Sequence, residues 1–81
     1  MDDIFTPKPD LKLGRYRHYK GNDYEVIDLA CHSETHEWLV VYRRLYERDG
    51  PDLWVRPYDM FIEAVEYEGK TLPRFAYIDS K

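Results

Sequence analysis

Apolar residues recur at alternate positions over several short stretches of this chain, a pattern that predicts β-strands. The longest such stretch is 37–46, where both alternating sets carry apolar residues. Trp38 and Tyr42 belong to one set, and Val41 and Leu45 to the other. Because successive side chains of a strand point to opposite faces, this strand needs cover on both sides. The pattern leaves open which face is the core, since a shift of one residue exchanges the two sets.

Turn signals divide the rest of the chain into further short elements. Additional strands are predicted at 13–19, 24–32, 53–56, 62–67 and 72–78. Pro57 has no backbone N–H to donate, so the segment 57–61 is predicted to form one short helical turn. No stretch has the periodicity of a long amphipathic helix. The pattern therefore predicts an all-β fold of five or six short antiparallel strands, closed or nearly closed into a small barrel.

The chain is long enough for one domain only. With 81 residues, it would bury roughly 60% of the surface that its unfolded form exposes. Residues 1–12 include Pro7 and Pro9 and show little periodicity, so we expect an extended or frayed lead-in. A single β-barrel domain is expected over 13–78.

Charge and cysteine content narrow the classes of function. A formal charge of −4 disfavours a general nucleic-acid binder, which usually carries a net basic field. Cys31 is the only cysteine, so no internal disulfide can form, and the first residues lack the basic and apolar regions of a signal peptide. No apolar run approaches the roughly 20 residues that a membrane helix needs. We expect a cytoplasmic domain with no membrane association.

Three motifs in this order and spacing resemble one small, mostly bacterial family. They are the segments 14–21, 30–35 leading into 40–43, and 53–57 followed by Met60 and Phe61. Together they resemble domain of unknown function 1653 from about Leu13 to Ile78. The resemblance implies an SH3-like barrel, in agreement with the strand pattern. It implies no reaction, so it assigns no catalytic residue.

A metal site is one alternative interpretation of the segment after the second predicted strand. Cys31, His32, Glu34 and His36 include the ligand types that zinc accepts. Cys31 and His32 point to opposite faces of a strand, however, and no second cluster completes four ligands. A small apolar cysteine beside solvated histidines explains the segment better, so we predict no metal and no cofactor.

An enzyme is a second alternative. His18 or His32 would act as the general base beside Glu34, which requires these side chains to converge on one pocket. Cys31 would need an electropositive, partly exposed setting to act as a nucleophile, and the sequence indicates none. No catalytic residue is therefore predicted, and enzymatic activity is left open as the weaker hypothesis.

The preferred hypothesis is a binding surface on which cationic and aromatic residues interleave. The arginine guanidinium can donate two parallel hydrogen bonds to a carboxylate or phosphate, and neighbouring aromatic rings can stack on a ligand. The predicted ligand-binding residues are Arg17, His18, Tyr19, His32, Glu34, Tyr42, Arg43, Trp54 and Arg56. They predict a non-enzymatic binding module for a protein, a peptide or an anionic small ligand.

The same residues are also compatible with two different arrangements. The aromatics could form the core while the arginines pair with acids such as Glu25, Asp59 or Glu63. Alternatively, exposed tyrosine and tryptophan side chains could pair across a two-fold axis, which would make the domain a homo-oligomeric structural or interaction domain. The sequence is compatible with a monomer and with a weak homodimer.

Overall fold

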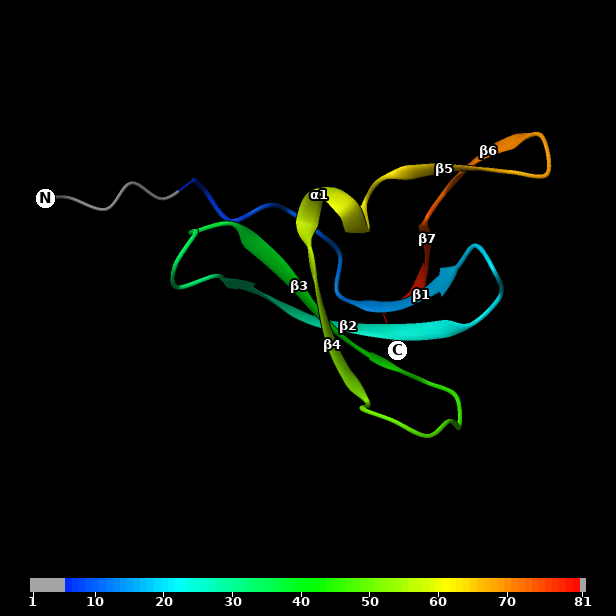
Figure 1. Cartoon of the computed structure of the whole chain (residues 1–81), viewed down its shortest axis with the longest axis horizontal. Helices are drawn as coiled ribbons and strands as arrows, with labels where there is room; N and C mark the ends of the chain where they lie inside the picture. Colours follow the sequence, from blue (N-terminus) through cyan, green and yellow to red (C-terminus); the bar gives the residue numbers. More distant parts are fainter. Residues whose placement is uncertain (1–5, 81) are drawn as a thin grey trace, which may run out of the picture.

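The computed structural model describes residues 6–80, which form seven strands and one short helix (Figure 1). In chain order these are β1 (Gly14–His18), β2 (Asp23–Cys31), β3 (Trp38–Arg44), β4 (Leu53–Pro57), α1 (Tyr58–Phe61), β5 (Ala64–Tyr67), β6 (Lys70–Pro73) and β7 (Phe75–Asp79). The predicted all-β fold with a helical turn near 57–61 is confirmed. Residues 1–5 of the predicted lead-in lie outside the described residues.

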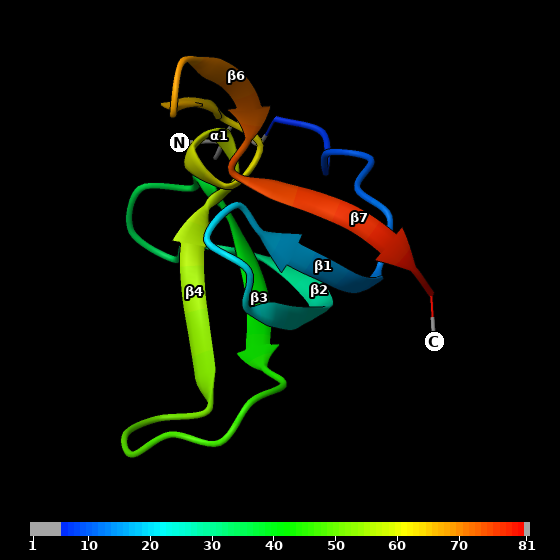
Figure 2. The ribbon, with the colours of Figure 1, turned by 90° about the vertical axis from the view of Figure 1, so that its right-hand side faces the viewer.

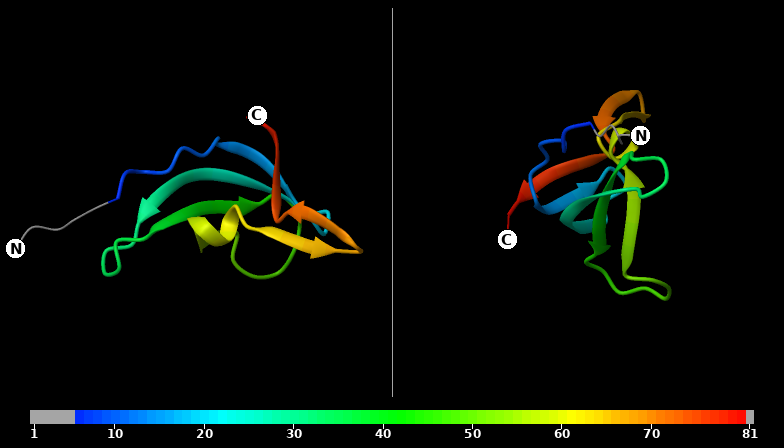
Figure 3. Two further views of the ribbon diagram at one scale, coloured as in Figure 1. Left: turned by 90° about the horizontal axis from the view of Figure 1, so that it is seen from above. Right: turned by 90° about the vertical axis from the view of Figure 1, so that its left-hand side faces the viewer.

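Five strands form one antiparallel sheet in the order β4-β3-β2-β1-β7, while β5 and β6 form a separate hairpin. The centre of the sheet is β2, and β3 lies between β2 and the edge strand β4. The views in Figures 2 and 3 show a strongly curved sheet with α1 near one end of β4. Bulges in β2 between Val26 and Asp28, and in β7 between Tyr77 and Asp79, accompany this curvature because a bulge bends and twists its strand.

The strand expected at 72–78 is divided into β6 and β7 at Arg74. The Arg74 N–H donates to the Glu63 carbonyl at 2.9 Å, and its guanidinium donates to the Glu63 carboxylate at 2.8 Å. The chain leaves the hairpin here, so that β7 can pair with β1. This division accounts for seven strands where five or six were expected. Among the described residues β4 and β7 remain the two sheet edges, so the hydrogen-bonded ladder does not close.

The core lies on the concave face of the sheet. Its buried side chains are Tyr16, Val26, Val40, Tyr42, Phe61 and Phe75. Phe61 of α1 stacks on Phe75 of β7 with 4.2 Å between ring centroids, so the helical turn closes this face. Val40 and Tyr42 are buried, whereas Leu45 is 42% exposed. The even-numbered positions of β3 therefore face the core, which the sequence pattern left open.

Residues 6–12 carry no strand but make several contacts with the sheet. The Trp38 indole N–H donates to the Thr6 carbonyl at 3.0 Å, and Lys8 pairs with Asp28 at 3.1 Å. The Tyr16 hydroxyl donates to the Lys12 carbonyl at 2.7 Å. Over residues 6–80, no helix has the length and apolar character needed to cross a membrane.

Candidate functional site

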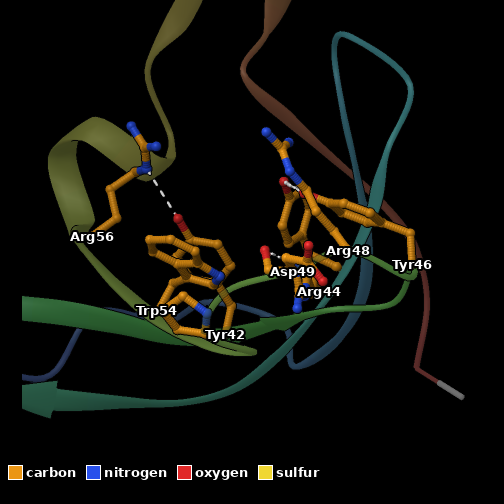
Figure 4. Close-up of a pocket in the computed structure, with 9 residues that line it drawn as sticks. Tyr42, Arg44, Tyr46, Arg48, Asp49, Trp54 and Arg56 are labelled. Atoms are coloured by element: carbon orange, nitrogen blue, oxygen red, sulfur yellow. Dashed lines mark hydrogen bonds between the residues drawn. The ribbon is translucent and has the colours of Figure 1, made fainter.

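A pocket of about 370 Å³ opens between β2, β3, β4 and the loop 45–52 (Figure 4). Its lining residues are Tyr24, Tyr42, Arg44, Tyr46, Arg48, Asp49, Pro51, Trp54 and Arg56. Five of these lining residues come from alternate positions of three neighbouring strands. Tyr24 pairs with Arg44, and Tyr42 pairs with Trp54. Arg56 lies on the same face of β4 as Trp54. The volume lies in the range that suits small organic ligands.

The floor and one wall of the pocket are aromatic. The Tyr24 ring meets the rings of Tyr42 and Tyr46 edge to face, with centroids 5.5 and 5.6 Å apart. Trp54 lies opposite Tyr42 on β4 and is 44% exposed. Rings held against each other in this way keep their faces in fixed positions, so they can stack against a planar ligand.

The hydroxyls of Tyr24 and Tyr46 form a hydrogen bond of 2.8 Å. Burial raises the pKa of Tyr24 to about 12, with further contributions from the hydrogen bond to Tyr46 and from the neighbouring Tyr42. The positive charge of Arg48 acts in the opposite direction. The Tyr24 hydroxyl is therefore neutral at physiological pH, and it adds no negative charge to the pocket.

Arg44 organises the loop that closes the pocket. Its side chain is only 7% exposed, and it donates to the Asp52 carboxylate at 3.1 Å. It also donates to the backbone carbonyls of Asp49 at 3.2 Å and Gly50 at 2.9 Å. Because these acceptors engage each of its three guanidinium nitrogens, Arg44 has a structural role in holding the loop.

Arg48 and Arg56 are different, because neither forms an ion pair with a carboxylate among residues 6–80. Arg56 donates from Nε to the Tyr42 hydroxyl at 3.3 Å, and its guanidinium carbon lies 5.8 Å from the Phe75 ring centroid. Figure 4 shows both guanidinium groups extending to the same side of the aromatic rings. Asp49 is the single acid among the lining residues. The pocket thus carries positive charge in a chain of net charge −4.

His18 lies next to this pocket without lining it. Its ring packs 5.0 Å from Phe75 and 6.4 Å from Tyr24, measured between centroids. Burial lowers the pKa of His18, and the positive charges of Arg56, Arg74 and Lys20 lower it further. Its Nδ1 accepts the backbone N–H of Lys20 at 3.2 Å. His18 therefore serves as a neutral packing residue behind Arg56.

The structure brings together only part of the predicted binding set. Tyr42, Trp54 and Arg56 line the pocket. Tyr19 follows His18 and meets Tyr67 of the hairpin at 5.2 Å between centroids.

Arg17 and Arg43 form ion pairs outside the pocket. Arg17 pairs with Asp23 at 2.7 Å, and Arg43 pairs with Glu25 at 2.7 Å. Because Arg43 alternates with Tyr42 along β3, it projects from the convex face. The pairing of Arg43 with Glu25 is the arrangement expected if the arginines are neutralised by neighbouring acids.

His32 and Glu34 occupy the turn between β2 and β3, at the opposite end of β2 from the pocket residue Tyr24. The Nδ1 of His32 accepts the backbone N–H groups of Glu34 at 3.0 Å and Thr35 at 3.2 Å, which holds the turn. Nine residues of β2 separate this turn from His18, a span of roughly 25–30 Å for an extended strand. His18 therefore does not converge with His32 and Glu34. In the described part of the chain, no three His, Cys, Asp or Glu side chains gather as metal ligands.

Sequence reasoning missed Tyr24, Arg44, Tyr46 and the loop residues 48, 49 and 51. Arg44 and Tyr46 continue the alternation that starts at Tyr42, so the pattern along β3 could have identified them. Tyr24 required the pairing of β2 with β3, which a single sequence does not reveal. The loop residues carried no signal, because their positions depend on the contacts of Arg44.

Comparisons with known proteins found similarity to one family and to a solved structure. A family model described as a protein of unknown function (DUF1653) matches residues 14–77. A crystal structure of a DUF1653 protein from Bordetella bronchiseptica is similar, with 42% sequence identity and a TM-score of 0.85. The alignment covers 89% of this chain and 92% of that one. No curated protein matches the chain.

Proposed function

Because this chain belongs to the DUF1653 family of proteins of unknown function, we propose a function from the chemistry of its own pocket. The protein is a non-enzymatic binding module that holds an anionic small ligand, or an acidic group of a peptide, between Arg48, Arg56 and the aromatic wall. The proposal includes an SH3-like domain over 13–78, of bacterial origin and with a cytoplasmic location. It assigns no catalytic step to any residue.

The observation that carries this proposal is the pair of arginines without carboxylate partners at an aromatic pocket. Surface arginines elsewhere are neutralised, as Arg17 is by Asp23 and Arg43 by Glu25. Arg48 and Arg56 have no such acid among the described residues, so their charges remain available. A guanidinium can donate two parallel hydrogen bonds to a carboxylate or phosphate.

The aromatic wall favours anions attached to a flat or apolar body. Trp54 is 44% exposed, and the paired hydroxyls of Tyr24 and Tyr46 add polar groups to the pocket lining. Stacking on such a ring contributes about 1–3 kcal/mol. A ligand with an acidic group and a planar group therefore fits the site better than inorganic phosphate alone.

Calorimetric titration tests the proposal with inorganic phosphate, a nucleoside monophosphate, an aromatic carboxylate and an acidic peptide. Arg48→Gln and Arg56→Gln are each expected to weaken binding about tenfold or more, because a hydrogen bond to a charged group contributes about 1.5–3 kcal/mol. Arg43→Gln is the matched control, since Arg43 is exposed on the opposite face. Equal affinities of the Arg48, Arg56 and Arg43 variants would contradict the proposed site.

A further inference from the structure

β4 is an exposed edge strand with an unusual share of apolar surface. Leu53 and Val55 on its convex side are each 59% exposed, and Trp54 on its concave side is 44% exposed. Among residues 6–80, β4 pairs with β3 only. Figure 2 shows β4 at the margin of the sheet, with its outer side turned away from β3. An edge of this kind is a template for pairing with another strand.

The register with β3 determines which backbone groups point outward. The Arg44 N–H donates to the Asp52 carbonyl at 3.1 Å, and hydrogen-bonded pairs alternate along an antiparallel ladder. Trp54 and Arg56 therefore direct their backbone groups toward β3, whereas Leu53 and Val55 direct theirs away from the sheet. The next outward positions on either side are Pro51 and Pro57, which have no N–H.

This arrangement is symmetric about Trp54. Pro51 lies three residues before Trp54, and Pro57 lies three residues after it. One outward N–H lies between Trp54 and each proline, that of Leu53 on one side and that of Val55 on the other. We propose that the protein forms a dimer in which two copies of β4 pair antiparallel about a two-fold axis at Trp54. Leu53 then lies opposite Val55 of the partner subunit, so both outward N–H groups of each copy gain a carbonyl acceptor.

The side chains match in this register on both faces of the sheet. On the convex face, Leu53 packs beside Val55 of the partner subunit, which covers the most exposed apolar residues of the strand. On the concave face, the two Trp54 side chains face each other, a pair type that stabilises antiparallel strands.

The charges match as well. Arg56 lies opposite Asp52 of the partner subunit, and the same pair recurs on the other side of the axis. Arg56 forms no ion pair among the residues of its own chain that the structure describes. The Asp52 carboxylate contacts Arg44 through one oxygen and is still 76% exposed, so it can accept a second donor.

A second copy of the chain is therefore the occupant that fits this edge. A shift of the axis to Val55 would place Arg56 opposite Trp54 and lose the pairing with Asp52. The other edge, β7, is a poorer template because its pairing with β1 is bulged and it ends at the ion pair of Asp79 with Arg15. Five residues on each side make a small interface, so the dimer is expected to be weak and dependent on concentration.

Sedimentation over roughly a hundredfold range of protein concentration tests the dimer. The unmodified protein is expected to shift from monomer to dimer. Asp52→Arg and Arg56→Asp should each weaken dimerisation at least tenfold, because like charges then face each other at both ends of the interface. The double variant Asp52→Arg/Arg56→Asp should recover most of the loss.

Glu34→Arg is the matched control for Asp52→Arg, since Glu34 is an exposed acid in the turn between β2 and β3. It should dimerise as the unmodified protein does. A protein that stays monomeric over the whole range, or a double variant weaker than both single variants, would overturn the proposal.

Cysteine cross-linking tests the register in a Cys31→Ser background. Two residues at position 54 would face each other with about 4.5 Å between Cα atoms, which allows a disulfide, so Trp54→Cys should cross-link rapidly. Two residues at position 55 would lie roughly 8–9 Å apart, beyond disulfide reach, so Val55→Cys should cross-link much more slowly. Equal or faster cross-linking at position 55 would reject an axis at Trp54. Trp54 and Arg56 also line the proposed ligand pocket, so a ligand would compete with the dimer for these side chains. Ligand-free protein is therefore used in both experiments, and failure of the dimer leaves the ligand proposal to its own titration.

Discussion

His18 is a single titratable residue whose pKa is lowered by burial among aromatic rings and by the positive charges of nearby arginines. Its ring lies among Phe75, Tyr19 and Tyr24, and burial is the largest cause of its lowered pKa. In the unfolded chain an imidazole takes up a proton near pH 6.5. Because the pKa of His18 is lower in the folded protein, the folded state binds this proton less readily than the unfolded state does. His18 therefore makes the stability of the fold depend on pH.

We predict that the fold loses stability when the pH falls below about 6.5. In that range the unfolded state binds more protons than the folded state, so acid favours unfolding until the lowered pKa of His18 is passed. Urea unfolding at about pH 7.5, 6.5 and 5.5 should show a smaller loss for His18→Gln than for the unmodified protein. Equal losses in the two proteins would show that His18 is not responsible.

Phe61 is the second residue whose contribution can be measured directly. It is 1% exposed and stacks on Phe75, so Phe61→Ala leaves a cavity in the centre of the core. The expected cost is about 3–5 kcal/mol, a large part of the stability of a small domain. Met60→Ala, at a 45% exposed position of the same helical turn, should cost less than about 1 kcal/mol in the same urea titration.

At the scale of elements, the contact between β1 and the end of β7 depends on Gly14. Gly14 has a φ of +125°, and a Cβ added there would lie 2.5 Å from the Asp79 carbonyl oxygen and 2.6 Å from the Ser80 Cα. Both the backbone conformation and the approach of the two strands therefore require glycine.

Gly14→Ala is expected to destabilise the fold by more than about 1 kcal/mol. Amide hydrogen exchange should increase most over β7, because the added methyl group displaces its last residues from β1. Gly21→Ala is the matched control: Gly21 also has a positive φ, of +109°, but a Cβ there meets nothing within 4 Å. If both variants show the same loss and the same exchange pattern, strain in φ alone explains the effect.

At the scale of the whole molecule, the β5–β6 hairpin is joined to the main sheet at its base. The Arg74 N–H donates to the Glu63 carbonyl at 2.9 Å. This bond lies next to the Ala64–Pro73 pair and extends the ladder of the hairpin by one pair at its base. The core residues all lie outside 64–73. The five-stranded sheet with α1 should therefore fold without the hairpin.

Replacement of 64–73 by Asn-Gly tests this separation. The two residues form a tight turn that can connect Glu63 directly to Arg74. We expect cooperative urea unfolding and an unchanged near-ultraviolet circular dichroism spectrum of the buried rings, apart from the lost contact of Tyr67 with Tyr19. Loss of cooperative unfolding would mean that the hairpin is part of the folding unit.

Much of the fold could be predicted because it depends on local chemistry. Alternation located β1 to β4, and Pro57 marked the start of the helical turn. The prediction from the sequence was wrong at Arg74. Alternation over 72–78 indicates one strand, but the residues before Arg74 pair with β5 and those after it pair with β1. The pairing of Arg74 with Glu63 is a contact over eleven residues, which a local pattern does not contain.

The sequence predicted which types of residue form the candidate site, but it did not predict which individual residues belong to it. The sequence identified Tyr42, Trp54 and Arg56, but it also included Arg17, Arg43, His32 and Glu34, which lie elsewhere. Residue type indicates what a side chain can bind. Whether an arginine is free or neutralised depends on which acid the neighbouring strand places opposite it, as Glu25 is placed beside Arg43.

Local sequence patterns predict most of the strands and turns and the two alternating faces of each strand, because the period of two is a property of the extended backbone. Long-range contacts of the folded chain place Val40 and Tyr42 in the core, β2 at the centre of the sheet, and Arg48 and Arg56 in one pocket. Such contacts join segments that are far apart in the chain, and no local pattern contains them.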